Sequence, residues 1–287
     1  MSRNQPIGIF DSGVGGLTVY RALHAHLPDE RFIYLGDTAR VPYGTKSLAT
    51  VERYAIENSQ FLASRGIKLL VVACNTASAL ALPAIRRTVG IDVVGVIGPG
   101  ARKAVALTVG KSDRPKIGVI ATEATIASRA YSEAIKKACE TAEIVETACP
   151  LFVPLAEENW TREPETHSIA EKYLQKIVEK NVDALVLGCT HYPILREVIQ
   201  ETVGANVILV DSGEATAEEV KKLLEDKKLA NENSPTSEIK RRLCDDLDHF
   251  YVTDAADRFA RVAERFLGVK PAKLEAIEVF GRDKLEN

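Results

Sequence analysis

Short runs of branched apolar residues alternate with longer stretches of helical period along this chain. In one helical stretch, Leu17, Tyr20, Leu23 and Leu27 recur every three or four residues and therefore share one face. This alternation is typical of an α/β fold with mainly parallel sheets. The predicted strands are residues 7–10, 32–35, 69–73, 93–96, 117–120, 144–147, 184–187 and 207–210.

The two halves of the chain echo each other. Ile7-Gly8-Ile9 in the first half is similar to Ile117-Gly118-Val119 in the second. In each half a later predicted strand is followed by a cysteine, Cys74 or Cys189. Ligands of open α/β sheets collect at the carboxyl ends of strands. We therefore expect two pseudo-symmetric α/β domains with the active site in the cleft between them.

The composition favours a folded protein with a large core, because 46% of the 287 residues are hydrophobic. A formal net charge of -3 argues against nucleic-acid binding. No apolar run approaches the roughly 20 residues that span a bilayer, and the first residues contain no apolar signal segment. We therefore expect a soluble, cytoplasmic protein without a membrane partner. Residues 227–238, rich in Lys, Asn, Ser and Glu, predict an exposed connection.

Cys74 and Cys189 each end an apolar run and precede polar residues that can begin a helix. A thiol in the first turn of a helix feels the positive end of the helix dipole, so we expect its pKa to fall from about 8.5 toward neutrality. An isolated cysteine is usually a small buried apolar residue, but two in parallel settings favour a pair of acid/base groups. The other three, Cys139, Cys149 and Cys244, lack such surroundings, and the odd total of five fits reduced thiols.

His191 lies two residues past Cys189, where its imidazole could exchange a proton with the thiol or a substrate. The alternative is a Cys-x-His metal site. That alternative is weak, because structural zinc needs about four ligands and the chain has no second Cys/His cluster. We expect neither a metal nor a cofactor.

Further polar groups follow the predicted strands. The turn Asp11-Ser12-Gly13-Val14-Gly15-Gly16 could hold an anion, although it lacks the spacing of a dinucleotide fingerprint or a P-loop and a plain capped turn is the alternative. A related Asp211-Ser212-Gly213 follows a later strand. The loop 41–45, near Asp37 and Arg40, has free N–H groups that could meet a carboxylate. With Asn75, Thr76 and Thr190 at the presumed helix starts, these groups suit a small dianionic or zwitterionic ligand.

Four motifs in this order resemble the glutamate racemase family, within the aspartate/glutamate racemases. They are Asp11-Ser12-Gly13-Val14-Gly15-Gly16, Val41-Pro42-Tyr43-Gly44, Ala73-Cys74-Asn75-Thr76-Ala77-Ser78 and Gly188-Cys189-Thr190-His191-Tyr192-Pro193. The resemblance runs from about residue 7 to residue 217 and continues more weakly to the C-terminal helix.

This resemblance implies an isomerase that interconverts L- and D-glutamate without a cofactor and supplies D-glutamate for peptidoglycan, and so for cell wall biogenesis and cell shape. It implies that Cys74 deprotonates D-glutamate and Cys189 deprotonates L-glutamate, assisted by Asp11 and His191. Glu157 resembles a further carboxylate that lines the site. The implied substrate-binding residues are Asp11, Ser12, Tyr43, Gly44, Asn75, Thr76, Thr190 and His191.

The resemblance also implies a two-domain division, with residues 1–97 plus 208–287 in the first domain and 98–207 in the second. A homodimer is expected. Some family members inhibit DNA gyrase, but no feature of this sequence supports that partner. Two alternatives remain open: a related aspartate- or hydantoin-type racemase, and a non-catalytic binding protein on the same scaffold.

Overall fold

The computed structural model describes residues 2–110, 113–231 and 241–279. Its strands form a six-stranded sheet of order β10-β9-β2-β1-β3-β4 and a four-stranded sheet of order β6-β5-β7-β8. The strands are β1 (Ile7–Asp11), β2 (Phe32–Gly36), β3 (Leu69–Val72), β4 (Asp92–Gly95), β5 (Lys116–Ala121), β6 (Glu143–Ala148), β7 (Ala184–Gly188), β8 (Ile208–Asp211), β9 (His249–Val252) and β10 (Leu274–Ala276).

Helices connect the strands in the alternation that the sequence predicts, and every strand pair among the described residues is parallel. The α-helices are α1 (Leu17–His26), α2 (Leu48–Ser64), α3 (Asn75–Leu80), α4 (Leu82–Thr88), α5 (Ile97–Thr108), α6 (Glu123–Ala127), α7 (Ala130–Ala138), α8 (Phe152–Glu157), α9 (Pro164–Glu179), α10 (Arg196–Val203), α11 (Ser212–Asp226) and α12 (Ala256–Leu267). Short 3-10 helices are η1 (Thr38–Arg40), η2 (Tyr43–Thr45) and η3 (Tyr192–Leu195).

All eight predicted strands are present, which confirms the α/β class. Two further strands, β9 and β10, were not predicted as strands. β10 has three residues, none of them fully buried, so it carries no apolar run by which it could be recognised.

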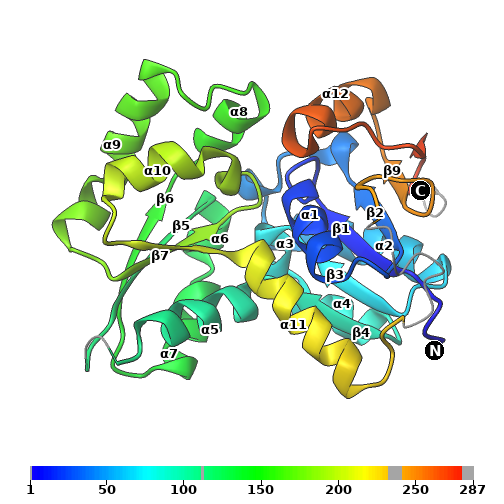
Figure 1. The fold of residues 1–287 in the computed structure, drawn as a ribbon, viewed down its shortest axis with the longest axis horizontal. Helices are drawn as coiled ribbons and strands as arrows, with labels where there is room; N and C mark the ends of the chain where they lie inside the picture. The colour runs from blue at the N-terminus through cyan, green and yellow to red at the C-terminus, as the bar shows by residue number, and fades with distance from the viewer. Residues whose placement is uncertain (1, 111–112, 232–240, 280–287) are drawn as a thin grey trace.

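The two sheets share an internal order. Strands β2-β1-β3-β4 of the first sheet correspond to β6-β5-β7-β8 of the second. β1 and β5 take equivalent places, and so do β3 and β7, the strands that precede the two cysteines. The pseudo-symmetry expected from the sequence is therefore present, and Figure 1 shows the sheets in two lobes set side by side.

The C-terminal part of the chain joins the first sheet. Helix α11 packs against both α1 and α5, and β9 and β10 then extend the six-stranded sheet beside β2. Strand β8, however, pairs with β7 in the second sheet. The domain division at residues 97/98 and 207/208 stays a prediction; sheet membership alone would draw the second limit after Asp211.

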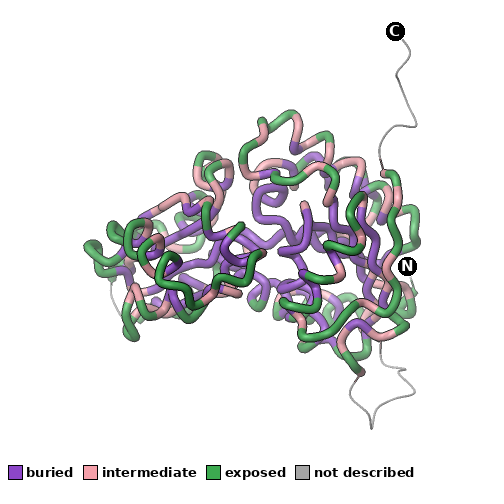
Figure 2. Tube along the Cα trace, turned by 90° about the horizontal axis from the view of Figure 1, so that it is seen from above, coloured by how far each residue is buried: buried purple, intermediate pink, exposed green. Residues whose placement is uncertain are grey.

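The apolar core lies on both faces of the first sheet, because successive side chains of a strand point to opposite faces. Ile7 and Ile9 of β1 pack in one apolar cluster with Leu17, Tyr20 and Leu23 of α1, so the predicted helix face is buried. Phe10 belongs to a second cluster on the other face of the sheet, with Val51 and Leu62 of α2 among others. The strands are thus covered on both sides, as parallel strands require. Figure 2 shows the buried backbone running through both lobes.

The predicted connection at residues 227–238 falls only partly within the structure. Residues 227–231 follow the end of α11, and 232–238 lie outside the described residues. Within the described ranges, no helix is long and apolar enough to cross a membrane.

Candidate active site

Cys74 stands directly after β3 and caps the first turn of α3. Its thiol donates to Oγ of Ser12 at 3.4 Å, and its sulfur accepts from the backbone N–H of Ala77 at 3.5 Å. Because β1 pairs with β3, the glycine-rich turn that follows β1 reaches this thiol. Two motifs that lie more than sixty residues apart therefore meet at one strand end.

The expected fall in the pKa of Cys74 is wrong for this thiol. Burial in the protein, helped by the nearby charges of Asp11 and Cys189, raises its pKa to about 12. The hydrogen bonds with Ser12 and with the backbone N–H of Ala77 act in the opposite direction but do not outweigh burial. Cys74 is therefore a protonated thiol at neutral pH, able to donate a proton.

Asp11, the last residue of β1, is fully buried. Its Oδ2 accepts from the backbone N–H of Gly13 at 2.8 Å, whereas Oδ1 has no hydrogen-bond partner. Burial raises the pKa of the Asp11 carboxyl, against the opposing effects of the His191 charge and of backbone N–H groups. An unpartnered buried acceptor is rare in native proteins, so Oδ1 is suited to accept from a ligand.

Cys189 follows β7 and is paired with His191. Nδ1 of His191 lies 3.9 Å from Sγ of Cys189, and Nε2 lies 3.1 Å from Oε1 of Glu157. Burial alone would lower the pKa of His191, but its hydrogen bonds and the charges of Cys189 and Glu157 raise it to about 10. Although burial acts to raise the pKa of Glu157, contact with His191 and with Arg258 lowers it. The ring is therefore an imidazolium between Sγ of Cys189 and the carboxylate of Glu157.

The glycine-rich turn and the Cys189 motif meet across the junction of the lobes. Oγ1 of Thr18 donates to the carbonyl of Thr190 at 2.8 Å. A Cβ at Gly15 would lie 2.2 Å from Oγ1 of Thr190 and 2.5 Å from the ring of His191, so only glycine fits there. The glycine-rich turn of the first sheet thus packs on the Cys189 motif of the second, and each half contributes to one site.

Asn75 and Thr76, at the start of α3, also contact the second half. Oδ1 of Asn75 accepts from the hydroxyl of Tyr131 at 2.7 Å, which leaves Nδ2 buried without a partner. Oγ1 of Thr76 lies 3.0 Å from Oγ1 of Thr122 and 3.3 Å from Oγ1 of Thr125. An unpartnered amide donor and a cluster of hydroxyls thus lie close to Cys74.

The predicted binding loop reaches the same junction through its backbone. A Cβ at Gly44 would lie 2.8 Å from Cβ of Thr122. The buried phenol of Tyr43 instead donates to Asp37 and accepts from Nδ2 of Asn58 at 3.1 Å. Asp37 also accepts from Arg40 at 2.7 Å. The side chain of Tyr43 therefore anchors the loop to Asp37 and Asn58. A ligand at this junction would meet the backbone of Gly44 rather than the phenol of Tyr43.

Sequence reasoning missed several of these residues. Thr122 follows β5 and caps α6, so its place after a strand is a signal that could have been used. Tyr131, Arg258 and Arg265 carry no such signal, because they come from helix positions whose partners lie far along the chain.

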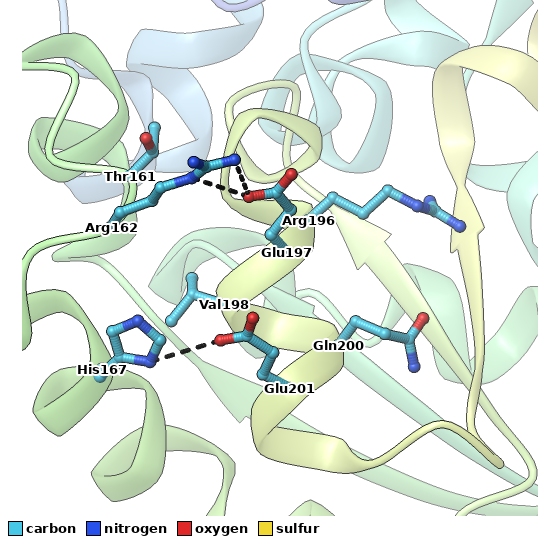
Figure 3. Close-up of a pocket in the computed structure, with 8 residues that line it drawn as sticks. All are labelled: Thr161, Arg162, His167, Arg196, Glu197, Val198, Gln200 and Glu201. Carbon is cyan, nitrogen blue, oxygen red and sulfur yellow. Dashed lines mark hydrogen bonds and ion pairs between the residues drawn. The ribbon is translucent and has the colours of Figure 1, made fainter.

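One surface pocket of the second lobe lies away from these residues. A cavity of about 690 Å³ lies between α9 and α10, where Arg162 pairs with Glu197 and His167 lies 3.8 Å from Glu201 (Figure 3). None of the predicted site residues lines it. A cavity of about 50 Å³ instead adjoins the glycine-rich turn, lined by Gly13, Glu157 and Arg258 among others. Among the described residues, no group of three His, Cys, Asp or Glu is placed to hold a metal ion.

Comparison with known proteins gives a consistent result. The family model described as Asp/Glu/hydantoin racemase matches residues 7–220. A glutamate racemase of Geobacter metallireducens is 55% identical over 92% of this chain and 93% of its own length, and one of Chlorobaculum parvum is 48% identical over 96% and 97%. The crystal structure of glutamate racemase from Francisella tularensis in complex with D-glutamate superposes with a TM-score of 0.86 at 37% identity, covering 96% of this chain and 98% of that one.

Proposed function

The chain belongs to the Asp/Glu/hydantoin racemase family, and we propose that it interconverts L- and D-glutamate by moving the α-proton between Cys74 and Cys189. The observation that carries this proposal is the pair of buried thiols, each after an equivalent strand and each with a separate set of partners. Inversion at an α-carbon needs a proton removed from one face and another delivered to the opposite face, which two such groups can perform.

The protonation of Cys74 and of His191 fits the L-to-D direction. The imidazolium of His191 would stabilise negative charge on Sγ of Cys189, 3.9 Å away, so that this thiolate takes the α-proton of L-glutamate. Cys74, held as a thiol by burial, then donates its proton to the other face of the α-carbon. The two sulfurs exchange states, and D-glutamate reacts by the reverse path. Asp11 assists on the Cys74 side and His191 on the Cys189 side.

Two unpartnered buried atoms support an amino-acid zwitterion as the ligand. Oδ1 of Asp11 is an acceptor suited to an ammonium group, and Nδ2 of Asn75 is a donor suited to a carboxylate. The hydroxyls of Ser12, Thr76 and Thr190 supply further hydrogen bonds. Clamping both ends of the substrate holds the α-carbon between the sulfurs, and fixed donors near it stabilise the developing carbanion.

The choice of glutamate rests on the relatives, which are named as glutamate racemases over nearly the whole length of this chain. We extend the proposal to the supply of D-glutamate for peptidoglycan, and hence to cell wall biogenesis and cell shape. Both reacting thiols must stay reduced, which fits the cytoplasm. We also propose a homodimer, which light scattering of the purified protein would test.

The direct test is a chiral assay with L- and D-glutamate, and with L- and D-aspartate, without added cofactor. We expect the wild type to racemise glutamate faster than aspartate, and Cys74→Ser and Cys189→Ser to lose about a thousandfold or more in rate. Cys139→Ser, a cysteine outside the site, is the matched control and should keep wild-type activity. Faster turnover of aspartate would refute the substrate, and an active Cys74→Ser or Cys189→Ser variant would refute the two-thiol reaction.

A further inference from the structure

Helix α12 reaches across from the first sheet to the acid–base group of the second. It follows β9, and its buried face, with Phe259, Val262 and Phe266, packs in the core. Figure 1 shows α12 above the right lobe beside α8, which belongs to the left lobe. Two arginine side chains of α12 join it to α8, and both contact Glu157.

Two arginines of α12 bind Glu157 at different atoms. Nη2 of Arg258 donates to Oε2 of the Glu157 carboxylate at 3.0 Å. Nη1 of Arg265 donates to the backbone carbonyl of Glu157 at 2.9 Å. Seven residues, or about two helical turns, separate the arginines, so they lie on one face of α12. Glu157 is the last residue of α8, where backbone carbonyls lack helical partners, and Arg265 supplies one.

The same residue holds the imidazole of the site. The second carboxylate oxygen of Glu157, Oε1, lies 3.1 Å from Nε2 of His191. The ring of Phe266, also on α12, meets the His191 ring edge to face at 6.0 Å. The carboxylate of Glu157 thus bridges Arg258 and His191, and the orientation of His191 toward Cys189 depends on contacts with α12.

The partners of the other thiol have a different origin. Asp11, at the end of β1, and Ser12 and Ala77, in the segments that follow β1 and β3, act on Cys74 and all belong to the first sheet's half of the chain. Contacts between α12 and the second lobe therefore bear directly on the Cys189 side of the reaction, through Glu157 and His191.

We propose that Arg258 and Arg265 are positioning residues that fix Glu157 against His191, so that helix α12 acts directly on proton transfer at Cys189 and, among the described residues, makes no hydrogen bond with Cys74 or its hydrogen-bond partners. This inference rests on the proposed function. Arg258 is 58% exposed on its side chain, so its direct Coulombic contribution is small. Its effect comes from geometry, because two hydrogen bonds from one helix leave Glu157 few alternative positions, and proton transfer is sensitive to small displacements.

A defect on one side of a racemase has a distinctive kinetic signature. The enantiomers have equal free energies in water, so the equilibrium constant is unity and kcat/KM must fall equally in both directions. The isotope effects need not change equally. If proton transfer at Cys189 is slowed, removal of the α-proton from L-glutamate becomes more rate-limiting, whereas its removal from D-glutamate by Cys74 becomes less so.

The experiment compares α-protonated and α-deuterated L- and D-glutamate with wild type and Arg258→Gln. We expect kcat/KM to fall about three- to tenfold in both directions. The isotope effect on kcat/KM should rise from L-glutamate and fall from D-glutamate, and Arg258→Lys should recover part of the loss. Arg261→Gln removes the same charge from an exposed position of α12 and should behave as wild type. Equal isotope effects in Arg258→Gln and wild type, or a rise from D-glutamate, would overturn the inference.

A double-mutant cycle tests whether Arg258 acts through Glu157. In a Glu157→Gln background, Arg258→Gln should cause little further loss, because the contact it supports is already weakened. Full additivity of the two losses would overturn the positioning role. A wild-type protein without racemase activity would instead refute the proposed function itself, so the two failures are distinguishable.

Discussion

The hydroxyl of Tyr131 donates a hydrogen bond of 2.7 Å to Oδ1 of Asn75, and the two residues are separated by 56 positions in the chain. With Oδ1 occupied, the amide of Asn75 is held with Nδ2 as its only unpartnered group. A helix of the second half thereby orients the amide that we propose as a substrate-binding donor of the first.

Replacing Tyr131 by phenylalanine should therefore weaken substrate binding. The Tyr131→Phe variant frees the Asn75 amide to rotate, and the loss of one hydrogen bond, about 1 kcal/mol, predicts a KM several-fold higher. The value of kcat should change less. Steady-state kinetics with both enantiomers checks this. Tyr20→Phe, which removes a buried phenol bonded to Asp248, is the control and should leave KM unchanged.

The pKa of Cys74 predicts how this thiol reacts with an alkylating agent in the absence of substrate. A thiol whose pKa is about 12 is protonated at neutral pH, and only its thiolate reacts. The alkylation rate should therefore rise about tenfold for each pH unit between pH 7 and 9. Mass spectrometry of the peptide that contains Cys74 gives the rate. A rate that is already constant above pH 7 would contradict the protonated state.

Asp11 should have opposite effects on alkylation and on racemisation. Its negative charge raises the pKa of Cys74, so Asp11→Asn should lower that pKa and speed alkylation of Cys74 at a fixed pH. The same change removes the carboxylate that we propose assists Cys74, and racemisation should slow. Slower alkylation in Asp11→Asn would show that the charge does not act on this thiol.

Gly15 should be intolerant of alanine. The new Cβ would lie 2.2 Å from Oγ1 of Thr190 and 2.5 Å from the ring of His191, so Gly15→Ala must push the Cys189 motif away. Overpacking of this kind costs about 1–3 kcal/mol, and we expect about a hundredfold loss of racemisation from the displaced imidazole. Urea unfolding and turnover measure the two effects. Gly90→Ala is the matched control, since its Cβ would meet nothing within 4 Å.

The two Asp-Ser-Gly turns should respond differently to mutation. Oδ1 of Asp211 accepts from the backbone N–H of Gly213 at 2.7 Å and caps α11. Asp211→Ala should therefore lower the free energy of unfolding by about 1 kcal/mol and leave turnover nearly unchanged. Asp11→Ala should instead reduce turnover strongly. Loss of activity in Asp211→Ala at temperatures where it stays folded would assign the second turn a part in the reaction.

Solvent deuterium distinguishes two bases from one. In D₂O the product enantiomer should carry deuterium at Cα from its first appearance, because the donating thiol exchanges with solvent. The remaining substrate should stay largely protiated early in the reaction. Proton NMR of both enantiomers after separation measures this. Equal early exchange into substrate and product would point to a single base.

The strands and the motifs at their ends could be predicted because their signals are local. The apolar runs marked eight strands, and the polar residues after β1, β3 and β7 marked the residues that meet at the junction of the lobes. β10 could not be predicted from the sequence, since this short and partly exposed strand contains no apolar run. The role of Glu157 was suggested only by family resemblance, because nothing in its own neighbourhood indicates that it reaches His191.

The sequence by itself determined the alternation of strands and helices, the internal repeat and the two thiols, since each depends on residues close together in the chain. The tertiary structure decided the electrostatics. The helix start predicts a lowered pKa for Cys74, but the protein packed around the thiol excludes water and raises it. Likewise, Arg258 contacts Glu157 across 101 positions. Desolvation and long-range contacts depend on what folding brings together, and no local pattern records them.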